Sequence, residues 1–333
     1  MLRYEASLKA IIKRIFVAGI VPAICFFMPA VSFAQVNWIN VDNDYAPLPL
    51  TVQVFKTTDA LDGKPFIAFY VKAKLDDRNL KFTVDTTLGR RLTPSQFYTK
   101  NNDPLLVVNT TFFSFETNKS LNAVIRDGKL IGYNIHSIPM RGKDTFQYRH
   151  PLGSAIGISK RRTADIAWLY TDSSEKYPYA TQTVRQAVKD SSDHFLVDKK
   201  KDQFKKWKMK TGVGGGPVLI QDGRIQISNN EELKFAGKAI SDMHPRTCMG
   251  YTRDGYLIIM VIQGRFPGVA EGATLLQEAK LLQELGCVEA LNLDGGGSSS
   301  MLINGKETIT PSGKDGGRGE QRPVPAVFII EKK

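Results

Sequence analysis

The feature that most constrains this chain is an apolar, strand-like run that ends in a carboxylate, three glycines and three serines, Leu291–Met301. Three consecutive glycines cost backbone entropy and contribute no side-chain packing, so another interaction must compensate for them. We expect the N–H groups of Gly295, Gly296 and Gly297 to approach a ligand closely, with Asp294 held at the strand end. Such a loop suits an anionic or sugar-phosphate ligand, and it predicts an active site.

The order of elements around this loop argues against a nucleotide-binding P-loop. A P-loop runs from strand to glycine loop to helix, and it places a lysine beside the phosphates. Here the glycines lead into a second apolar run and a turn at 301–305, and the loop contains no lysine. A backbone cradle for a different anion is the better interpretation.

The first 34 residues have the pattern of a secretory signal peptide. Four basic residues precede an apolar stretch, and small residues then fit a signal-peptidase site. We expect cleavage after Ala34, with an uncleaved membrane anchor as the alternative. This predicts an exported protein, periplasmic or secreted, with one large domain over 35–333.

The cysteine and histidine content does not indicate a metal site. Two cysteines remain after the signal peptide, Cys248 and Cys287. The sequence leaves open whether they pair in an oxidising compartment or stay as buried free thiols. Neither has the spacing of a metal site, and the four histidines are scattered, so we expect neither a metal nor a cofactor.

The middle of the chain is predicted mostly as strand. The segments 67–71, 80–84 and 105–108 are apolar and rich in β-branched or aromatic residues. Asp-Gly or Asn-Gly pairs between apolar runs predict four hairpins, whose turns are Asp127-Gly128, Asp222-Gly223, Asp254-Gly255 and Asn304-Gly305.

One helix is expected from Thr274 to Leu285. Thr274 and Gln277 form a capping box, and Gly286 terminates the helix. Together with the strands, this predicts an α+β fold, a β-rich single catalytic domain with a mixed, largely antiparallel sheet and a few helices.

Other segments share the chemistry of the opening run, because they place amide, hydroxyl, guanidinium or glycine groups beside predicted strands. These segments are Asn109–Phe113, Gly212–Leu219, His244–Gly250, Gln263–Arg265 and Arg318–Pro325. Together with the opening run they resemble the phosphodiester glycosidase family. The elements Asn-x-x-Phe-Phe, Gly-Gly-Pro-x-Leu, Pro-Arg-Thr, Leu-Asp-Gly-Gly-Gly-Ser-Ser and Arg-Pro occur in the family's order, within about 109–328.

The resemblance implies hydrolysis of a sugar that is joined through its anomeric oxygen to a phosphodiester. By motif it also implies that ten residues surround one cleft: Asn109, Gly216, Arg246, Thr247, Asp294, Gly295, Gly296, Gly297, Ser298 and Arg322. Arg265, Glu271 and Ser299 lie in or beside the same segments, and we add them as candidate substrate-binding residues.

The residue types agree with this chemistry. Cleavage at an anomeric carbon passes through an oxocarbenium-like state, which a carboxylate stabilises as nucleophile, base or electrostatic partner. Asp294 is the candidate for that role. A phosphate leaving group is a weak base, so charge stabilisation by Arg246 and Arg322 matters more than a general acid. Candidates for a second carboxylate are Glu271, Asp242, Asp315 and Glu320, among which the sequence does not choose.

Each candidate residue also has an interpretation in which it only stabilises the fold and takes no part in catalysis or binding. Asp294 is a residue type that caps turns, and Asn109 at a buried strand end is able to satisfy backbone groups. Arg246 and Arg322 are of a type that forms surface ion pairs. Ser298 has no histidine nearby in the sequence, so we interpret it as a phosphate or hydroxyl ligand rather than a nucleophile.

A basic segment departs from the family pattern. Seven lysines and one aspartate lie in Lys199–Lys210, with Phe204 and Trp207 between them, and a surface insertion is predicted over about 171–210. Such a segment is able to hold an anionic polymer or a membrane surface, or it is simply a solvated face. Nucleic acid is not expected as a partner, because the chain has no recognisable binding motif.

The sequence therefore predicts an exported hydrolase of sugar-1-phosphodiester bonds in a cell-envelope or extracellular glycan. One alternative is a non-catalytic module that binds a glycan or an anionic polymer. Another is a hydrolase of the same fold that acts on ordinary glycosides or at phosphorus. Asp294, intact and accompanied by two arginines, favours the first interpretation.

Overall fold

The computed structural model describes residues 36–140, 147–189, 204–313 and 319–333. The predicted signal peptide lies outside the described residues, as do Asp315 and much of the basic segment. In the described part of the chain, no helix is both long and apolar enough to pass through a bilayer.

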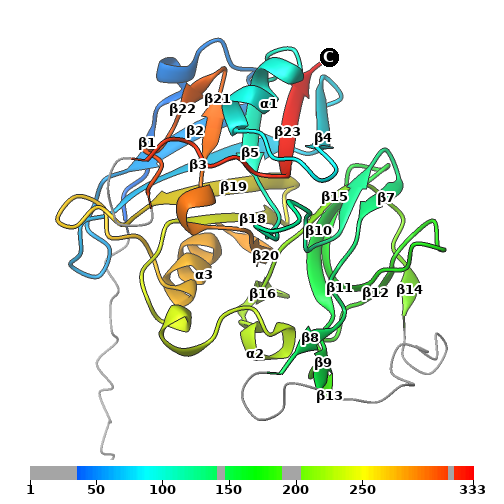
Figure 1. Cartoon of the computed structure of the whole chain (residues 1–333). Coiled ribbons are helices and arrows are strands. Elements are labelled where there is room, and N and C mark those ends of the chain that lie inside the picture. The colour runs from blue at the N-terminus through cyan, green and yellow to red at the C-terminus, as the bar shows by residue number, and fades with distance from the viewer. Residues whose placement is uncertain (1–35, 141–146, 190–203, 314–318) are drawn as a thin grey trace, which may run out of the picture. The chain divides into compact units, whose positions relative to one another are not determined.

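The largest sheet within the described residues has eight strands in the order β1-β2-β3-β19-β18-β20-β16-β17. Their bounds are β1 Ile39–Asn40, β2 Val52–Thr57, β3 Ile67–Lys74, β16 Val218–Gln221, β17 Arg224–Ile225, β18 Arg246–Thr252, β19 Tyr256–Gln263 and β20 Cys287–Asn292. Because β18 pairs with β20, the Pro-Arg-Thr segment lies beside the strand that leads into the glycine run (Figure 1).

A seven-stranded sheet follows the order β14-β12-β11-β10-β15-β6-β7. Its bounds are β6 Val124–Arg126, β7 Lys129–Gly132, β10 Gly153–Ser159, β11 Ala164–Tyr170, β12 Tyr179–Thr181, β14 Lys205–Lys206 and β15 Met209–Gly214. A small sheet of β8 Ile138–Pro139, β9 Tyr148–His150 and β13 Val188–Lys189 lies below it in Figure 1.

A five-stranded sheet has the order β22-β21-β5-β23-β4. Its bounds are β4 Leu80–Thr86, β5 Leu106–Asn109, β21 Met301–Ile303, β22 Lys306–Glu307 and β23 Ala326–Lys332. The antiparallel pairing of β5 with β21 brings Asn109 next to the end of the glycine–serine run.

Few helices accompany the sheets in the described residues. They are α1 Pro94–Lys100, α2 Asn229–Glu232, α3 Leu275–Glu284 and the short 3-10 turns η1 Asp42–Tyr45, η3 Gly237–Ile240 and η4 Gly296–Ser298. α3 begins with the predicted capping box of Thr274 and Gln277, and Gly286 follows its end with φ +81°. The sequence prediction for this helix is confirmed.

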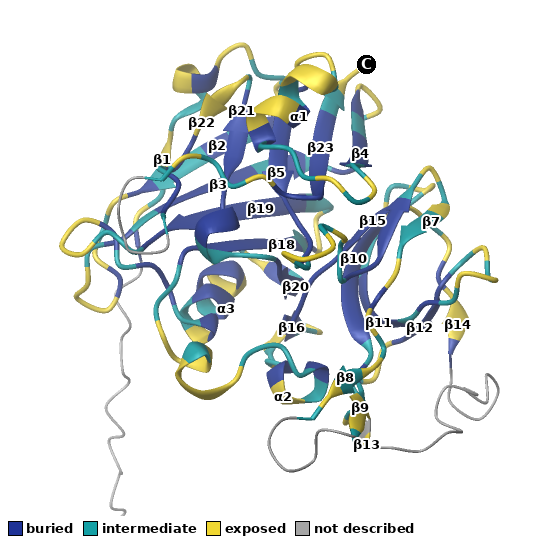
Figure 2. Ribbon diagram, in the orientation of Figure 1, coloured by how far each residue is buried: buried dark blue, intermediate teal, exposed yellow. Residues whose placement is uncertain are grey.

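The main core lies where the three larger sheets face one another. Ile259 of β19, Phe328 of β23 and Trp168 of β11 belong to one cluster of buried side chains. A second cluster lies between α3 and the opposite face of the eight-stranded sheet, and Leu282 is part of it. Figure 2 shows the central strands buried, so the site described below is built on a rigid frame.

The predicted fold class is confirmed. Each of the four Asp-Gly or Asn-Gly pairs joins two antiparallel strands, in the hairpins β6–β7, β16–β17, β18–β19 and β21–β22. All strand pairs found among the described residues are antiparallel, so the parallel component of a mixed sheet is not seen there. Both mature cysteines are buried free thiols.

The aromatic residues of the basic segment have a structural role. Phe204 is 7% exposed and Trp207 is 5% exposed, and the Trp207 indole donates a hydrogen bond to Asp165 at 2.5 Å. The expectation that these rings interact with a polymer is therefore wrong, because their faces pack inside the protein. The described lysines next to them, Lys205 and Lys208, remain exposed.

Candidate active site

The glycine–serine loop is anchored to neighbouring strands through its own backbone. The N–H of Leu293 donates to Thr247 O at 2.8 Å, and the N–H of Asp294 donates to Thr110 O at 2.7 Å. The N–H of Gly296 donates to Pro245 O, also at 2.8 Å. The loop therefore continues β20 across the ends of β18 and β5, and it presents the Asp294 side chain at their junction.

Asn109 fixes this loop from below. Its Nδ2 donates to Asp294 O at 2.5 Å, and its Oδ1 accepts from Thr247 Oγ1 at 2.8 Å and from the Ser300 N–H at 3.1 Å. Both Asn109 and Thr247 are completely buried. All of these contacts are within the protein, so Asn109 and Thr247 position the loop. This agrees with the interpretation in which Asn109 satisfies backbone groups at a buried strand end.

Asp294 lies half-buried beside hydrogen-bond donors. Burial raises the pKa of its carboxyl to about 7, while the Ser298 hydroxyl, the nearby Arg322 guanidinium and the Gly295 N–H each act to lower that pKa. The Arg322 Nη1 in turn donates to Ser298 Oγ at 3.3 Å. Arg322, Ser298 and Asp294 thus form a connected chain, in which the carboxyl is able to change protonation near neutral pH.

The glycines have a different role from the predicted one. Since Gly296 donates to Pro245 and Gly295 lies against Asp294, these two N–H groups serve the protein itself. A side chain on Gly296 would lie 3.0 Å from Arg265 Nη2, and one on Gly297 would collide with Arg322 Nη2. These two amides are therefore used by the protein, and the glycines also make room for two guanidinium groups, while an anion-binding role of the Gly297 N–H stays a prediction.

These two arginines form the positive part of the site. Arg265 has a left-handed backbone with φ +65°, which is uncommon for a residue with a Cβ and is found at functional sites. Desolvation lowers the pKa of Arg265, and the neighbouring Arg322 lowers it further. Two guanidinium groups held close together are suited to binding a phosphate group.

Arg246 is more deeply placed. It is 2% exposed, and its Nε and Nη2 donate to Ala273 O at 2.9 Å and Asp242 O at 3.2 Å. Desolvation lowers the pKa of Arg246, and the buried Glu278 opposes that change. Two of its donors are therefore used by backbone carbonyls, and its predicted catalytic role stays a prediction.

Glu278 is a functional candidate that the sequence did not reveal. Its side chain is fully buried on α3, and its carboxyl group lies beside the Cys248 thiol, with no nitrogen or oxygen partner in the described structure. Burial raises the pKa of Glu278 to about 7, and Arg246 acts to lower it. In the sequence Glu278 occupies an ordinary helix position, so no local signal separated it from other helical glutamates.

His244 was also missed, although it directly precedes the Pro-Arg-Thr motif. Its Nδ1 is buried without a hydrogen-bond partner in the described structure. Burial lowers the pKa of His244, and Arg246 and Arg265 lower it further. Because it faces both arginines, its neutral ring adds no competing positive charge to the site.

The second glycine cluster lies beside the end of β20. Gly216 exchanges hydrogen bonds with Asn292, at 2.7 Å from its N–H to Asn292 O and 2.7 Å from Asn292 Nδ2 to Gly216 O. Its φ of +121° requires glycine, and a side chain there would strike Glu232 and Lys234. Burial lowers the pKa of the Lys234 ammonium, and Glu232 acts to raise it.

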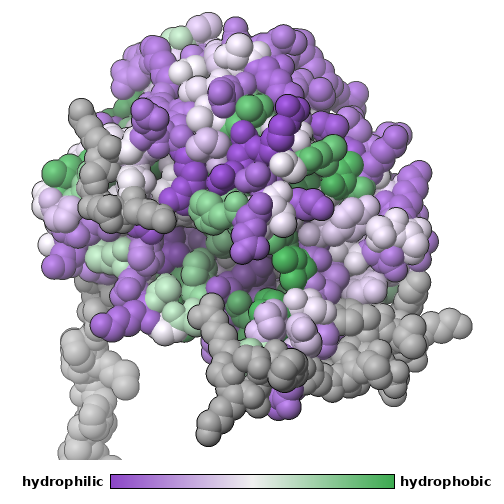
Figure 3. Space-filling model, viewed as in Figure 1, coloured by the Kyte–Doolittle hydropathy of each residue, from purple (hydrophilic) through white to green (hydrophobic). Residues whose placement is uncertain are grey.

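A cavity of about 400 Å³ lies beside Glu232 and Lys234, the two side chains that a Cβ at Gly216 would strike. Phe112, Leu152, Glu232 and Lys234 are among its lining residues. The Glu232 carboxylate is held by buried donors, including Ser154 Oγ and Ser228 Oγ, each at 2.6 Å. Figure 3 shows a hollow near the middle of this face, where hydrophilic surface is bordered by hydrophobic side chains.

Other predicted residues are placed differently. Glu271 accepts a hydrogen bond from the Gly268 N–H at 3.1 Å in an exposed loop, while Asp242 and Glu320 are exposed. The structure therefore does not bring these carboxylates to Asp294 by a described contact. Ser299 is buried with an unpartnered hydroxyl in the described structure, as is Thr111.

Asn109 gives a test of the loop's anchorage. We expect Asn109→Leu to lower the free energy of unfolding by about 3 kcal/mol, because it leaves a buried hydroxyl, N–H and carbonyl without partners. Urea denaturation measures the change, with Asn79→Leu as a control at an exposed position. A loss under about 1 kcal/mol would show that the loop does not depend on Asn109.

Comparison with known proteins agrees with this description. The family model described as phosphodiester glycosidase matches residues 102–331. N-acetylglucosamine-1-phosphodiester alpha-N-acetylglucosaminidase from Mus musculus is 31% identical over 101 residues, which are 30% of this chain and 19% of that protein. The Homo sapiens protein of the same name is 30% identical over 108 residues, or 21% of its length. The chain thus matches about a fifth of these relatives.

Solved structures share the fold. A hypothetical protein from Synechocystis has a TM-score of 0.58 at 16% identity, and the match covers 90% of this chain and 64% of that one. The catalytic domain of zebrafish N-acetylglucosamine-1-phosphodiester alpha-N-acetylglucosaminidase, auto-inhibited by its pro-peptide, has a TM-score of 0.54 at 20% identity. That match covers 86% of this chain and 85% of the zebrafish domain. At these identities the likeness concerns the fold.

Proposed function

The chain belongs to the phosphodiester glycosidase family, and from this premise we propose that it hydrolyses the bond between a sugar's anomeric carbon and a phosphodiester oxygen. The observation that supports this most is the position of Asp294 beside Arg265 and Arg322 on one glycine-rich loop. A carboxylate and two guanidinium groups beside one loop would suit a substrate that combines a sugar with a phosphate.

In the proposed reaction, the bond between the anomeric carbon and the phosphodiester oxygen breaks, and its electron pair leaves with the phosphate. Asp294 acts as the base that takes a proton from the attacking water while its charge stabilises the oxocarbenium-like state. The raised pKa of Asp294 suits this role near neutral pH, since a base works best with a pKa close to the working pH.

Arg265 and Arg322 are proposed to bind the phosphate and to stabilise the negative charge that grows on its leaving oxygen. This makes a second carboxylic acid unnecessary, because the departing phosphate does not need to be protonated. The cavity lined by Glu232 and Lys234 is proposed to receive the part of the substrate that extends from the reacting bond. The paired guanidinium groups favour a phosphodiester over an ordinary glycoside.

We further propose that the protein is exported and that its substrate is a sugar-1-phosphodiester of a cell-envelope or extracellular glycan. The basic, apolar and small-residue pattern of residues 1–34 supports export. A module that only binds a glycan would not need a carboxyl group such as that of Asp294, with a pKa raised to about 7. The presence of this group therefore favours an enzyme.

Oxygen-18 labelling tests the proposed reaction. The full chain is incubated with an alpha-N-acetylglucosaminyl phosphodiester in oxygen-18 water, in parallel with Asp294→Asn. We expect the label in the released sugar, because water attacks the anomeric carbon. Label in the phosphate would overturn the assignment, and absence of turnover over a panel of sugar-1-phosphodiesters would favour a binding module.

A further inference from the structure

A second charged feature lies at the opposite end of the strands from the candidate site. It is a cavity of about 410 Å³, here called the basic groove, and seven of its eleven lining residues are lysine or arginine. Arg78, Lys160, Arg161 and Lys210 are four of them, and all are exposed. No aspartate or glutamate is among the lining residues.

One cation of the groove is held in place by the protein backbone. Arg162 donates from Nη2 to Leu80 O at 2.6 Å and from Nη1 to Leu75 O at 3.3 Å, and its guanidinium lies 5.5 Å from the Phe82 ring centre. Phe82 and Ile158 are buried and form an apolar floor. The cations therefore surround a fixed guanidinium on a rigid base.

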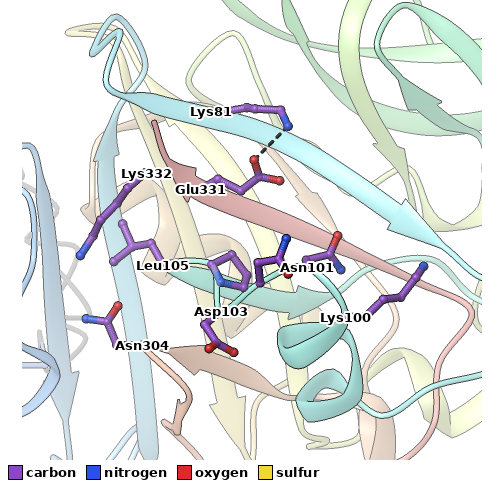
Figure 4. Close-up of a pocket in the computed structure, with 10 residues that line it drawn as sticks. Lys81, Lys100, Asn101, Asp103, Leu105, Asn304, Glu331 and Lys332 are labelled. Atoms are coloured by element: carbon purple, nitrogen blue, oxygen red, sulfur yellow. Dashed lines mark hydrogen bonds and ion pairs between the residues drawn. The ribbon is translucent and has the colours of Figure 1, made fainter.

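A neighbouring cavity provides the contrast. It has a volume of about 460 Å³ and shares Lys81 with the basic groove, and two of its three lysines form ion pairs. Lys81 pairs with Glu331 at 2.9 Å and Lys100 with Asp85 at 2.6 Å. Figure 4 shows the first of these pairs across β4 and β23. In the described structure, no such ion pair is found for Arg78, Lys160, Arg161 or Lys210 of the basic groove.

Several like charges without protein counterions repel one another, so their retention in one hollow favours an external anion. Arginine binds phosphate through two parallel N–H bonds, and lysine adds a point charge. Six residues separate Lys210 from Gly216 along and just beyond β15. At about 3.3 Å per residue of extended chain, this separation corresponds to about 20 Å. A single small substrate in the candidate site would not reach the groove.

We propose that the basic groove binds a linear polymer that carries phosphodiester groups. The hollow shape favours a chain that enters it over a flat membrane surface. This proposal does not depend on the proposed hydrolysis, because the groove is able to bind such a polymer even if the candidate active site catalyses a different reaction. The sequence suggested that Phe204 and Trp207 of the basic segment bind a polymer. The proposed binding site is instead the basic groove, to which the same segment contributes Lys210.

Fluorescence anisotropy with a labelled oligomer of glycerol phosphate tests the proposal. The full chain is compared with the variant Lys160→Glu/Arg161→Glu, and with Lys64→Glu/Arg224→Glu as a control of the same net charge at exposed positions elsewhere. We expect the groove variant to raise Kd at least about tenfold and the control to change it less than about twofold, because only the former reverses charge beside the ligand. Melting curves verify that all three proteins are folded.

Four results would overturn the proposal. They are no binding of the oligomer, equal weakening in both variants, equal binding of a carboxylate polymer such as polygalacturonate, and preference for phosphatidylglycerol vesicles over the oligomer. The last would identify a membrane surface as the partner. Because binding is measured without turnover, none of these results depends on the proposed hydrolysis.

Discussion

Replacing Asp294 by asparagine is expected to lower kcat/KM for a sugar-1-phosphodiester by about 10³–10⁴-fold. Asparagine keeps the size of the side chain and its bond from Ser298, but it neither takes a proton from water nor carries negative charge. Steady-state hydrolysis of one substrate by both proteins measures the loss. A reduction under about tenfold would remove Asp294 from the reacting centre.

The pH dependence gives an independent check. With the pKa of Asp294 raised to about 7, the wild-type kcat/KM is expected to rise with pH and to level off above that value. The residual activity of Asp294→Asn is expected to lack this limb. A wild-type limb near pH 4 would instead assign the titration to an ordinary exposed carboxyl.

The same substitution is expected to affect stability in the opposite sense from activity. Since the folded pKa of Asp294 is above its ordinary value of 3.8, the folded state keeps a proton that the unfolded state has lost between these two values. Stability therefore falls as pH rises from about 4 to 7, and Asp294→Asn avoids this loss. The variant should match wild type at pH about 4 and exceed it by about 1–2 kcal/mol at pH about 8.

Replacing Arg322 by methionine is expected to give the second large effect, a fall in kcat/KM of about 10²–10³-fold. Methionine keeps an unbranched stem but removes the guanidinium that contacts Ser298 and adjoins Gly297. Substrates with a less basic phosphate leaving group should lose less, because they need less charge stabilisation. Arg322→Lys should keep part of the activity, since it retains the charge but not the planar pair of donors.

A shift in the pH profile separates this role from simple loss of structure. Because Arg322 lowers the pKa of Asp294, the limb of the profile should move to higher pH in Arg322→Met. Arg224→Met, at an exposed position of the edge strand β17, is the matched control and should change neither quantity. An unmoved limb together with unchanged leaving-group dependence would contradict the proposed role of Arg322.

Local signals were sufficient for much of the fold. The Asp-Gly and Asn-Gly turns, the capping box at Thr274 and the apolar run before Asn109 each depend on a few adjacent residues. The burial of Phe204 and Trp207 was not predicted, because it depends on contacts between segments distant in the sequence. Lysines beside an aromatic ring give the same sequence pattern whether the ring is buried or exposed, and only the packing of β14 against β12 decides between them.

By itself the sequence determined the antiparallel elements, the capped helix and the carboxylate at the head of the glycine run, because turn, cap and glycine chemistry act over short distances. Tertiary structure alone decided what the glycines are for. Arg265 comes from the end of β19 and Arg322 from the segment before β23, yet both lie against Gly296 and Gly297. Contacts between segments so far apart in the chain leave no local pattern, since they arise from strand register and the packing of separate sheets.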